Sequence, residues 1–248
     1  PGPNAAPQIG PVVISEIMYR PADVFVNGGL WDNTEDEFVE LHNISGGPVD
    51  LYDVNTVTNT WRLRDAVNYS FPLNQTLAAG ERVLVVNFDP VLNTGEATRF
   101  RAKYGMDSST RLFGPFSGKL SNSDEDVELV QPDLVRFYGT NEVITAVIVD
   151  KVDYRDEAPW SAAADGIGAS LNRIDDAAFG NDPINWVAAS PTPGAGYVAG
   201  DAPVITAQPI DTSVIEFMNA SFSVSATSAG PLQYQWRFNG TIIPNANS

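Results

Sequence analysis

Two glutamates and the single histidine are the residues of this chain whose types could support acid–base catalysis. Glu16 and Glu40 fall in two separate apolar runs, and a pair of carboxylates is what glycoside hydrolysis requires. A histidine-dependent triad would have to use His42, the only histidine. All three fall inside expected β-strands, where such residues are more often exposed or structurally hydrogen-bonded. We therefore assign no catalytic residues and expect a protein that is not an enzyme.

Two oxygen-rich segments are candidates for a calcium site. Residues 32–37 read Asp-Asn-Thr-Glu-Asp-Glu, and residues 124–126 read Asp-Glu-Asp. Calcium prefers several carboxylate and carbonyl oxygens, but neither segment has the spacing or the glycine of an EF-hand loop. The expectation is two solvated turns, with calcium as the alternative. We assign no metal ligands and no cofactor-binding residues.

The composition narrows the classes of partner. The chain has 31 acidic against 14 basic residues, a net charge of −17, which repels phosphate backbones and anionic lipid surfaces. We expect no nucleic acid and no direct membrane insertion, because no apolar run is long enough to span a bilayer. Cysteine is absent, which excludes disulfides, zinc–cysteine sites and thiol catalysis and is compatible with bacterial secretion.

The elements that must position these residues are mostly short strands. Eighteen prolines and twenty glycines indicate many turns, and the apolar runs between them are of strand length. Residues 23–36 are expected as a loop and residues 133–142 as a loop or a ragged hairpin. The pattern predicts an all-β sandwich. The expected strands are 12–19, 37–44, 49–52, 61–63, 68–71, 82–88, 127–130, 146–154 and one within 166–174.

One short helix is predicted between Thr94 and Gly105. Thr94 can cap its start, Ala97, Phe100 and Tyr104 share a face, and Gly105 stands where helices end. The other face carries the basic residues Arg99, Arg101 and Lys103. We expect a solvated face, with a contact surface as the alternative.

Several separated motifs resemble the lamin-tail domain in order and spacing. They are residues 38–43 (FVELHN), 61–63 (WRL), 69–72 (YSFP) and 76–81 (TLAAGE). The bacterial, secreted branch of the family is the closer likeness, on residues 14–19, 100–105, 120–123 and 185–188. The resemblance implies an immunoglobulin-like β-sandwich over residues 11–195 and a non-catalytic module. The chain departs from the lamin-tail pattern in two places, the long loop before Glu37 and the insert at residues 53–60.

The remainder of the chain differs in composition. Residues 203–248 have only Asp211, Glu216 and Arg237 as charged residues, so residues 1–202 carry −16 of the net charge. Residues 222–226 and 233–240, with Trp236, resemble the B and C strands of a second immunoglobulin-like domain. We expect linkers at 1–10 and 196–202, and at 203–248 the first half of that domain with an apolar face left bare. The linker-like start suggests a piece of a longer protein.

Two functions follow as hypotheses. The first is a structural or binding module of a larger extracellular or cell-surface bacterial protein, serving adhesion, anchoring or display of other domains, with a protein or glycan as partner. The alternative is an accessory carbohydrate-binding region of a secreted hydrolase. A solvent-facing row of aromatic side chains would favour the alternative, and the candidates for it are Trp31, Trp61 and Trp160.

Overall fold

The chain divides into two compact units, Pro1–Tyr197 and Val198–Ser248, and each is described by itself. The computed structural model describes residues 9–26, 28–138, 141–199, 204–216, 218–227, 232, 234, 236–239 and 241–243. Within these ranges the one α-helix has 11 residues, and no helix is long and apolar enough to cross a bilayer.

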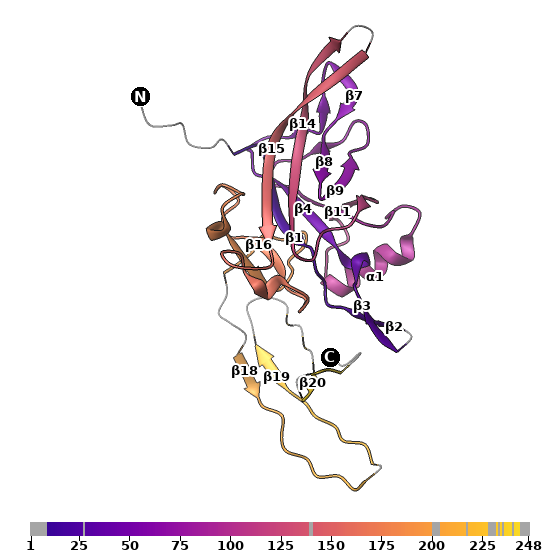
Figure 1. Ribbon diagram of the computed structural model, residues 1–248, viewed down its shortest axis with the longest axis vertical. Coiled ribbons are helices and arrows are strands. Elements are labelled where there is room, and N and C mark those ends of the chain that lie inside the picture. The colour runs from indigo at the N-terminus through magenta and orange to yellow at the C-terminus, as the bar shows by residue number, and fades with distance from the viewer. Residues whose placement is uncertain are drawn as a thin grey trace. The chain divides into compact units, whose positions relative to one another are not determined.

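A six-stranded sheet forms the first layer of unit 1 (Figure 1). All neighbours in it are antiparallel except β11 and β12, which run parallel. In order across the sheet, the strands are β12 (Arg111–Phe113), β11 (Arg82–Val86), β4 (Phe38–Asn43), β1 (Val12–Met18), β16 (Ser170–Arg173) and β17 (Trp186–Ala189).

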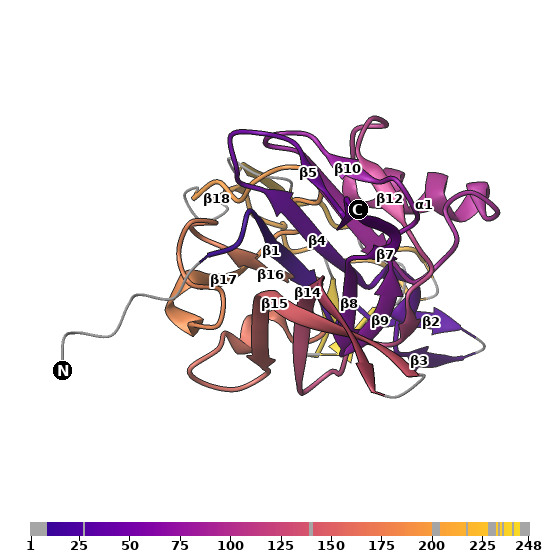
Figure 2. The same ribbon diagram turned by 90° about the horizontal axis from the view of Figure 1, so that it is seen from above.

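A five-stranded antiparallel sheet forms the second layer. Seen from above, β8, β9, β14 and β15 lie to one side of β1 and β4 (Figure 2). The two layers confirm the predicted all-β sandwich. In order, the strands are β13 (Ser117–Gly118), β9 (Val67–Ser70), β8 (Arg62–Asp65), β14 (Asp124–Tyr138) and β15 (Asn141–Arg155).

The main core lies between the sheets and follows the alternation of side chains along each strand. On β1, both Ile14 and Ile17 face this core although they are three residues apart. A register shift between Ile14 and Glu16 makes this possible. The bulge leaves Ser15 and Glu16 outside the apolar core, on the outer face of the six-stranded sheet.

A second, smaller core covers part of that outer face. Helix α1 (Thr94–Tyr104) packs Phe100 and Tyr104 against Phe38 of β4, with edge-to-face ring centroids 5.9 and 5.5 Å apart. Asn93, not Thr94 as predicted, is the N-cap residue, and no side chain caps the helix start. The helix ends as predicted at Gly105, whose φ of 61° is the left-handed conformation that glycine adopts readily.

Two segments differ from the expectation. Residues 23–36 contain a hairpin of β2 (Val24–Val26) and β3 (Gly29–Trp31) and a 3-10 helix, Thr34–Asp36. Residues 186–189, for which no strand was predicted, form β17. At 133–142, where a loop or a ragged hairpin was predicted, strands β14 and β15 form a hairpin with a register shift between Pro132 and Val135. The smaller strands are β5 (Val49–Asp50), β6 (Tyr52–Asp53), β7 (Thr56–Thr60) and β10 (Thr76–Leu77).

In unit 2 the structure describes two short strand pairs, β18 (Val204–Ala207) with β19 (Ser225–Thr227) and β20 (Arg237–Phe238) with β21 (Thr241–Ile242). The expected B strand begins at Ser225 instead of Phe222, and residues 233, 235 and 240 of the expected C strand lie outside the described residues. Val204, Ile205, Ile210 and Phe238 are exposed. The half-domain at 203–248 stays a prediction.

Candidate functional site

The two candidate glutamates lie side by side on the outer face of the six-stranded sheet. Glu16 on β1 is directly opposite Glu40 on β4, and the two side chains are almost fully buried. The Glu40 carboxylate accepts hydrogen bonds from Arg82 Nη1 at 2.6 Å, Ser15 Oγ at 2.6 Å and the backbone N–H of Gly194 at 2.5 Å. Sequence reasoning identified both residues but could not place them together.

The Glu16 carboxyl is held from the opposite side. It accepts from Ser170 Oγ at 2.5 Å and from the backbone N–H of Thr192 at 3.1 Å. Burial raises the pKa of Glu16 well above its usual range, and the neighbouring Glu40 carboxylate raises it further. Burial also raises the pKa of Glu40, although Arg82 opposes the shift. The two carboxyls thus differ in their surroundings, since Glu40 has the Arg82 cation as a direct partner and Glu16 does not.

Two neighbouring carboxyls in different electrostatic surroundings are an arrangement that glycosidases use. Here both groups are closed to solvent, with exposed fractions of 1% and 0%. Their hydrogen bonds go to the segment that covers them, at Thr192 and Gly194. The arrangement therefore fixes this segment to the sheet and offers a substrate no access.

His42 extends the same network. Its Nδ1 lies 2.7 Å from Asp176 Oδ2, and Arg82 Nη2 donates to the same oxygen at 2.6 Å. Burial alone would raise the pKa of Asp176, but His42 and Arg82 outweigh it and lower that pKa. The network hydroxyls of Ser15 and Ser170 donate to the glutamates and not to His42. The triad for which His42 was considered is therefore not assembled here.

The acidic residues at 32–37 point to different partners. Asp32 pairs with Lys119 at 3.1 Å, Asp36 pairs with Arg99 at 2.7 Å and also with Lys103, and Glu37 accepts from the backbone N–H of Leu120 at 2.9 Å. Arg99 and Lys103 belong to the basic face of α1. We expected this face to be solvated, but two of its three basic side chains pair with Asp36.

The second acidic segment is the start of β14 and not the expected turn. Asp126 pairs with Lys151 at 2.6 Å, and Glu125 accepts from the backbone N–H of Ser121 at 2.7 Å. With Asp124 and others they line a hollow of about 490 Å³. In the part of the chain that the structure describes, no three acidic or histidine side chains are grouped to hold a metal ion.

The three candidate tryptophans differ in their exposure to solvent. Trp61 and Trp160 are buried, and Trp160 packs against Trp186 with ring centroids 6.1 Å apart. Trp31 on β3 has 62% of its surface exposed. The other large apolar side chains of the β2–β3 hairpin, Val24, Phe25, Val26 and Leu30, are exposed as well.

This exposed hairpin stands where the sequence pattern predicted a loop. The residues 24–31 read Val-Phe-Val-Asn-Gly-Gly-Leu-Trp, and an Asn-Gly pair between apolar runs is a hairpin signal. Val24 is opposite Trp31, and Phe25 is opposite Leu30. Residues opposite each other point to the same face, so the two pairs point to opposite faces. The hairpin is apolar on both sides.

Comparison with known families accounts for the sandwich. A family model, Lamin Tail Domain, matches residues 5–154. The chain belongs to the lamin tail domain family. The match ends at Tyr154, before β16 and β17, whereas the predicted sandwich extends to residue 195. Lamin tail domains are non-catalytic immunoglobulin-like domains, which is compatible with a structural module. A comparison with curated proteins finds no match.

Proposed function

We propose that this lamin tail domain protein is a binding module of a larger extracellular or cell-surface bacterial protein, in which it anchors or displays neighbouring domains. The β2–β3 hairpin carries the proposal. Five large apolar side chains are exposed on a two-stranded ribbon, and such a ribbon is marginally stable without further packing. The extracellular location is supported by the absence of cysteine and by the motifs shared with the secreted branch of the family.

The shape and charge of the hairpin indicate the kind of partner. Apolar side chains on both faces require a partner that covers both, such as an apolar groove of a protein, because a flat surface covers one face only. Asp23 and Asp32 flank the hairpin in a chain of net charge −17, which disfavours an anionic membrane and favours a basic rim around the groove. We take a protein groove as the partner.

The alternative, an accessory carbohydrate-binding region, would use stacked aromatic side chains on one surface. Trp61 and Trp160 are buried, and Phe25 and Trp31 lie on opposite faces of the hairpin. No described surface therefore presents the row of Trp61, Trp160 and Trp31 that the alternative required. The hairpin fits a groove better than a sugar ring.

The test is a comparison of three forms of the full chain on arrays of secreted and surface proteins and on a glycan array. The double variant Phe25→Ser/Trp31→Ser removes one large apolar side chain from each face. We expect protein-array binding to weaken at least tenfold, because buried aromatic side chains dominate interface energies. The control, Val91→Ser/Leu92→Ser, removes apolar side chains elsewhere that are even more exposed and should bind as the parent does.

Both variants should keep the free energy of unfolding within about 0.5 kcal/mol of the parent, because the changed side chains are exposed. Glycan binding that Phe25→Ser/Trp31→Ser abolishes, without any protein binding, would contradict the proposal and favour the alternative. Equal protein binding by all three forms would contradict the role of the hairpin.

A further inference from the structure

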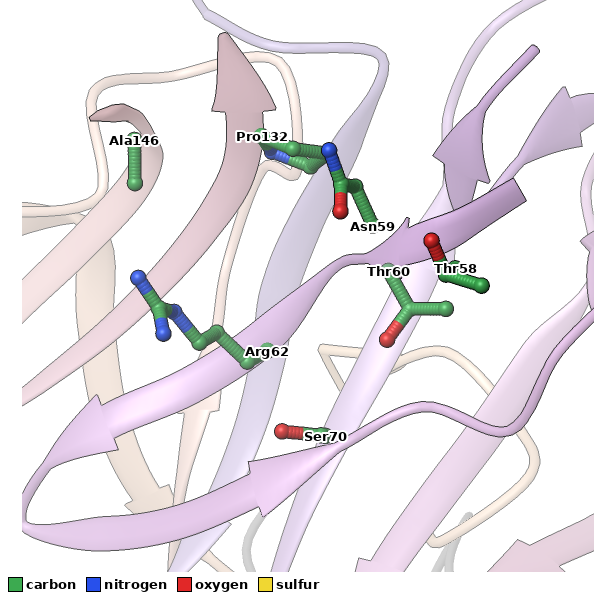
Figure 3. A pocket seen from close by; sticks show the side chains of 7 residues that line it. All are labelled: Thr58, Asn59, Thr60, Arg62, Ser70, Pro132 and Ala146. Carbon is green, nitrogen blue, oxygen red and sulfur yellow. The ribbon is translucent and has the colours of Figure 1, made fainter. Parts of the chain in front are cut away.

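A polar pocket lies on the outer face of the five-stranded sheet, away from the hairpin residues (Figure 3). Its volume of about 630 Å³ is in the range of small-molecule sites. Figure 3 shows the Arg62 side chain reaching from β8 in the direction of Ala146 on β15. The remaining lining is supplied by Thr58, Asn59, Thr60, Ser70 and Pro132.

Arg62 has no internal partner, in contrast to the equivalent arginine two residues along the strand. Arg64 is opposite Glu128 on β14 and pairs with it at 2.7 Å. Arg62 is opposite Val130 on β14 and Ser70 on β9, neither of which is acidic. Among the lysines and arginines whose side chains the structure describes, only Arg62 has neither a hydrogen bond nor an ion pair.

Asn59 gives a second, independent indication of a ligand. Its side chain lines the same pocket and is 7% exposed, and its Nδ2 is buried without any hydrogen-bond partner. A buried amide group without a hydrogen-bond partner destabilises the fold, so native proteins seldom retain one without a reason. A small rotation of the side chain in the presence of a ligand would satisfy it.

We propose that this pocket binds a sugar acid, a monoanionic carboxylate that also carries several hydroxyl groups. The guanidinium of Arg62 matches one carboxylate with two parallel hydrogen bonds. The hydroxyls of Thr58, Thr60 and Ser70 and the amide of Asn59 both donate and accept, as neighbouring sugar hydroxyls require. This site is independent of the proposed role of the hairpin.

The charge around the pocket restricts the ligand to a single negative charge. Among the lining residues that the structure describes, Arg62 is the one with a cationic side chain. A second hollow of about 400 Å³ shares Pro132 with this pocket, and its lining includes Asp50, Asp53 and Asp133. These carboxylates repel a polyanion that extends beyond the pocket, which disfavours nucleotides and highly charged polymers.

Isothermal titration of the full chain with glucuronate tests the site. We expect saturable binding and a rise in melting temperature with ligand concentration. Arg62→Gln should weaken binding at least tenfold, because it removes a charge-assisted hydrogen-bond pair. Its matched control, Arg64→Gln, should change binding less than about threefold, because Arg64 is engaged with Glu128.

Asn59→Leu should also weaken binding about tenfold, and the free energy of unfolding shows whether this variant folds. Thr60→Val, of nearly equal size, removes one hydroxyl and should weaken binding several-fold even if the leucine variant does not fold. Glucose tests the carboxylate requirement and inorganic phosphate tests the hydroxyl requirement. Both should bind at least tenfold more weakly than glucuronate.

Two further ligands distinguish the source of the sugar acid. Methyl glucuronide and a short uronate-containing oligosaccharide bind as well as glucuronate if the site takes a residue of a polysaccharide, and more weakly if it takes the free acid. Either result supports the site. The absence of glucuronate binding, equal losses in Arg62→Gln and Arg64→Gln, or equal affinity for phosphate would overturn it.

Discussion

The carboxyl group of Glu37 should make the stability of this domain fall as pH rises. Glu37 is fully buried, and burial raises its pKa from 4.5 to about 8, with a smaller contribution from the Asp32 charge. One oxygen, Oε2, accepts from the backbone N–H of Leu120, and the other, Oε1, has no partner among the described residues. The folded protein therefore retains a proton at neutral pH that the unfolded chain releases.

The sign and size follow from proton linkage. Between pH 4.5 and 8 the folded state binds more protons at Glu37 than the unfolded state, so the free energy of unfolding falls as pH rises. The slope approaches about 1.4 kcal/mol per pH unit, or about 2.5 kcal/mol between pH 5 and pH 7. The stabilisation that protonated Glu37 provides is lost through this window. Above pH 8 the free energy of unfolding no longer changes with pH through Glu37.

Glu37→Gln isolates this effect, because the amide has the shape of the protonated carboxyl and its oxygen can accept from Leu120. The free energy of unfolding of the parent and of the variant is measured in urea at pH 5, 6, 7 and 8. At pH 5 the two values should be similar. At pH 7 the variant should have gained about 2.5 kcal/mol over the parent. The buried Trp61 and Trp160 report the transition by fluorescence.

The contribution of other buried carboxyls cancels in this comparison. Glu16 and Glu40, whose pKa values are also raised, add the same slope to parent and variant. Glu35→Gln, an exposed neighbour, is the control and should leave the pH profile unchanged. Coincident slopes for the parent and Glu37→Gln would show that Glu37 is ionised in the folded protein and would refute the reasoning.

Three further predictions concern stability. Arg82→Met leaves Glu40 buried without its cation and should cost about 3–5 kcal/mol in urea unfolding. By contrast, Arg155→Met, at an exposed pair 3.7 Å apart, should cost less than about 1 kcal/mol. Phe100→Ala should cost about 3–5 kcal/mol because it empties the core under α1, whereas the exposed Leu92→Ala should be nearly neutral. Calcium should leave the melting temperature unchanged relative to chelator, because Asp36 and Asp126 already pair with basic residues; a clear rise would restore the calcium alternative.

The strands that the sequence predicted are those with a buried face. The apolar run at 82–88 became β11, and 12–19 became β1, because alternating side chains there meet a core. The hairpin of β2 and β3 has no buried face, since its side chains are exposed on both sides, and so it lacks the alternating pattern. Strand β17 has only one fully buried residue, Trp186, which explains why its pattern was too weak to recognise.

The candidate sites depend on register, which composition and motifs do not reveal. Glu16 meets Glu40 only because a bulge at Ser15 shifts β1 by one position. Arg62 and Arg64 are indistinguishable in the sequence, and the residue opposite each decides that one is paired and the other is not. Long-range pairing of this kind is set by the whole sheet, so a local pattern predicts the residue types without their partners.

The outer face of the six-stranded sheet explains why a structural domain retains buried charges. One end of this face is apolar, where Phe38 and Val86 are opposite each other beneath α1. At the other end Arg82 is opposite His42, and Glu40 accepts a backbone N–H from Gly194. An apolar contact would allow the covering segment to slide, whereas a buried carboxylate is satisfied at one position of the backbone only. The polar end thus defines where residues 192–194 lie, at the cost of the raised pKa values that make the fold sensitive to pH.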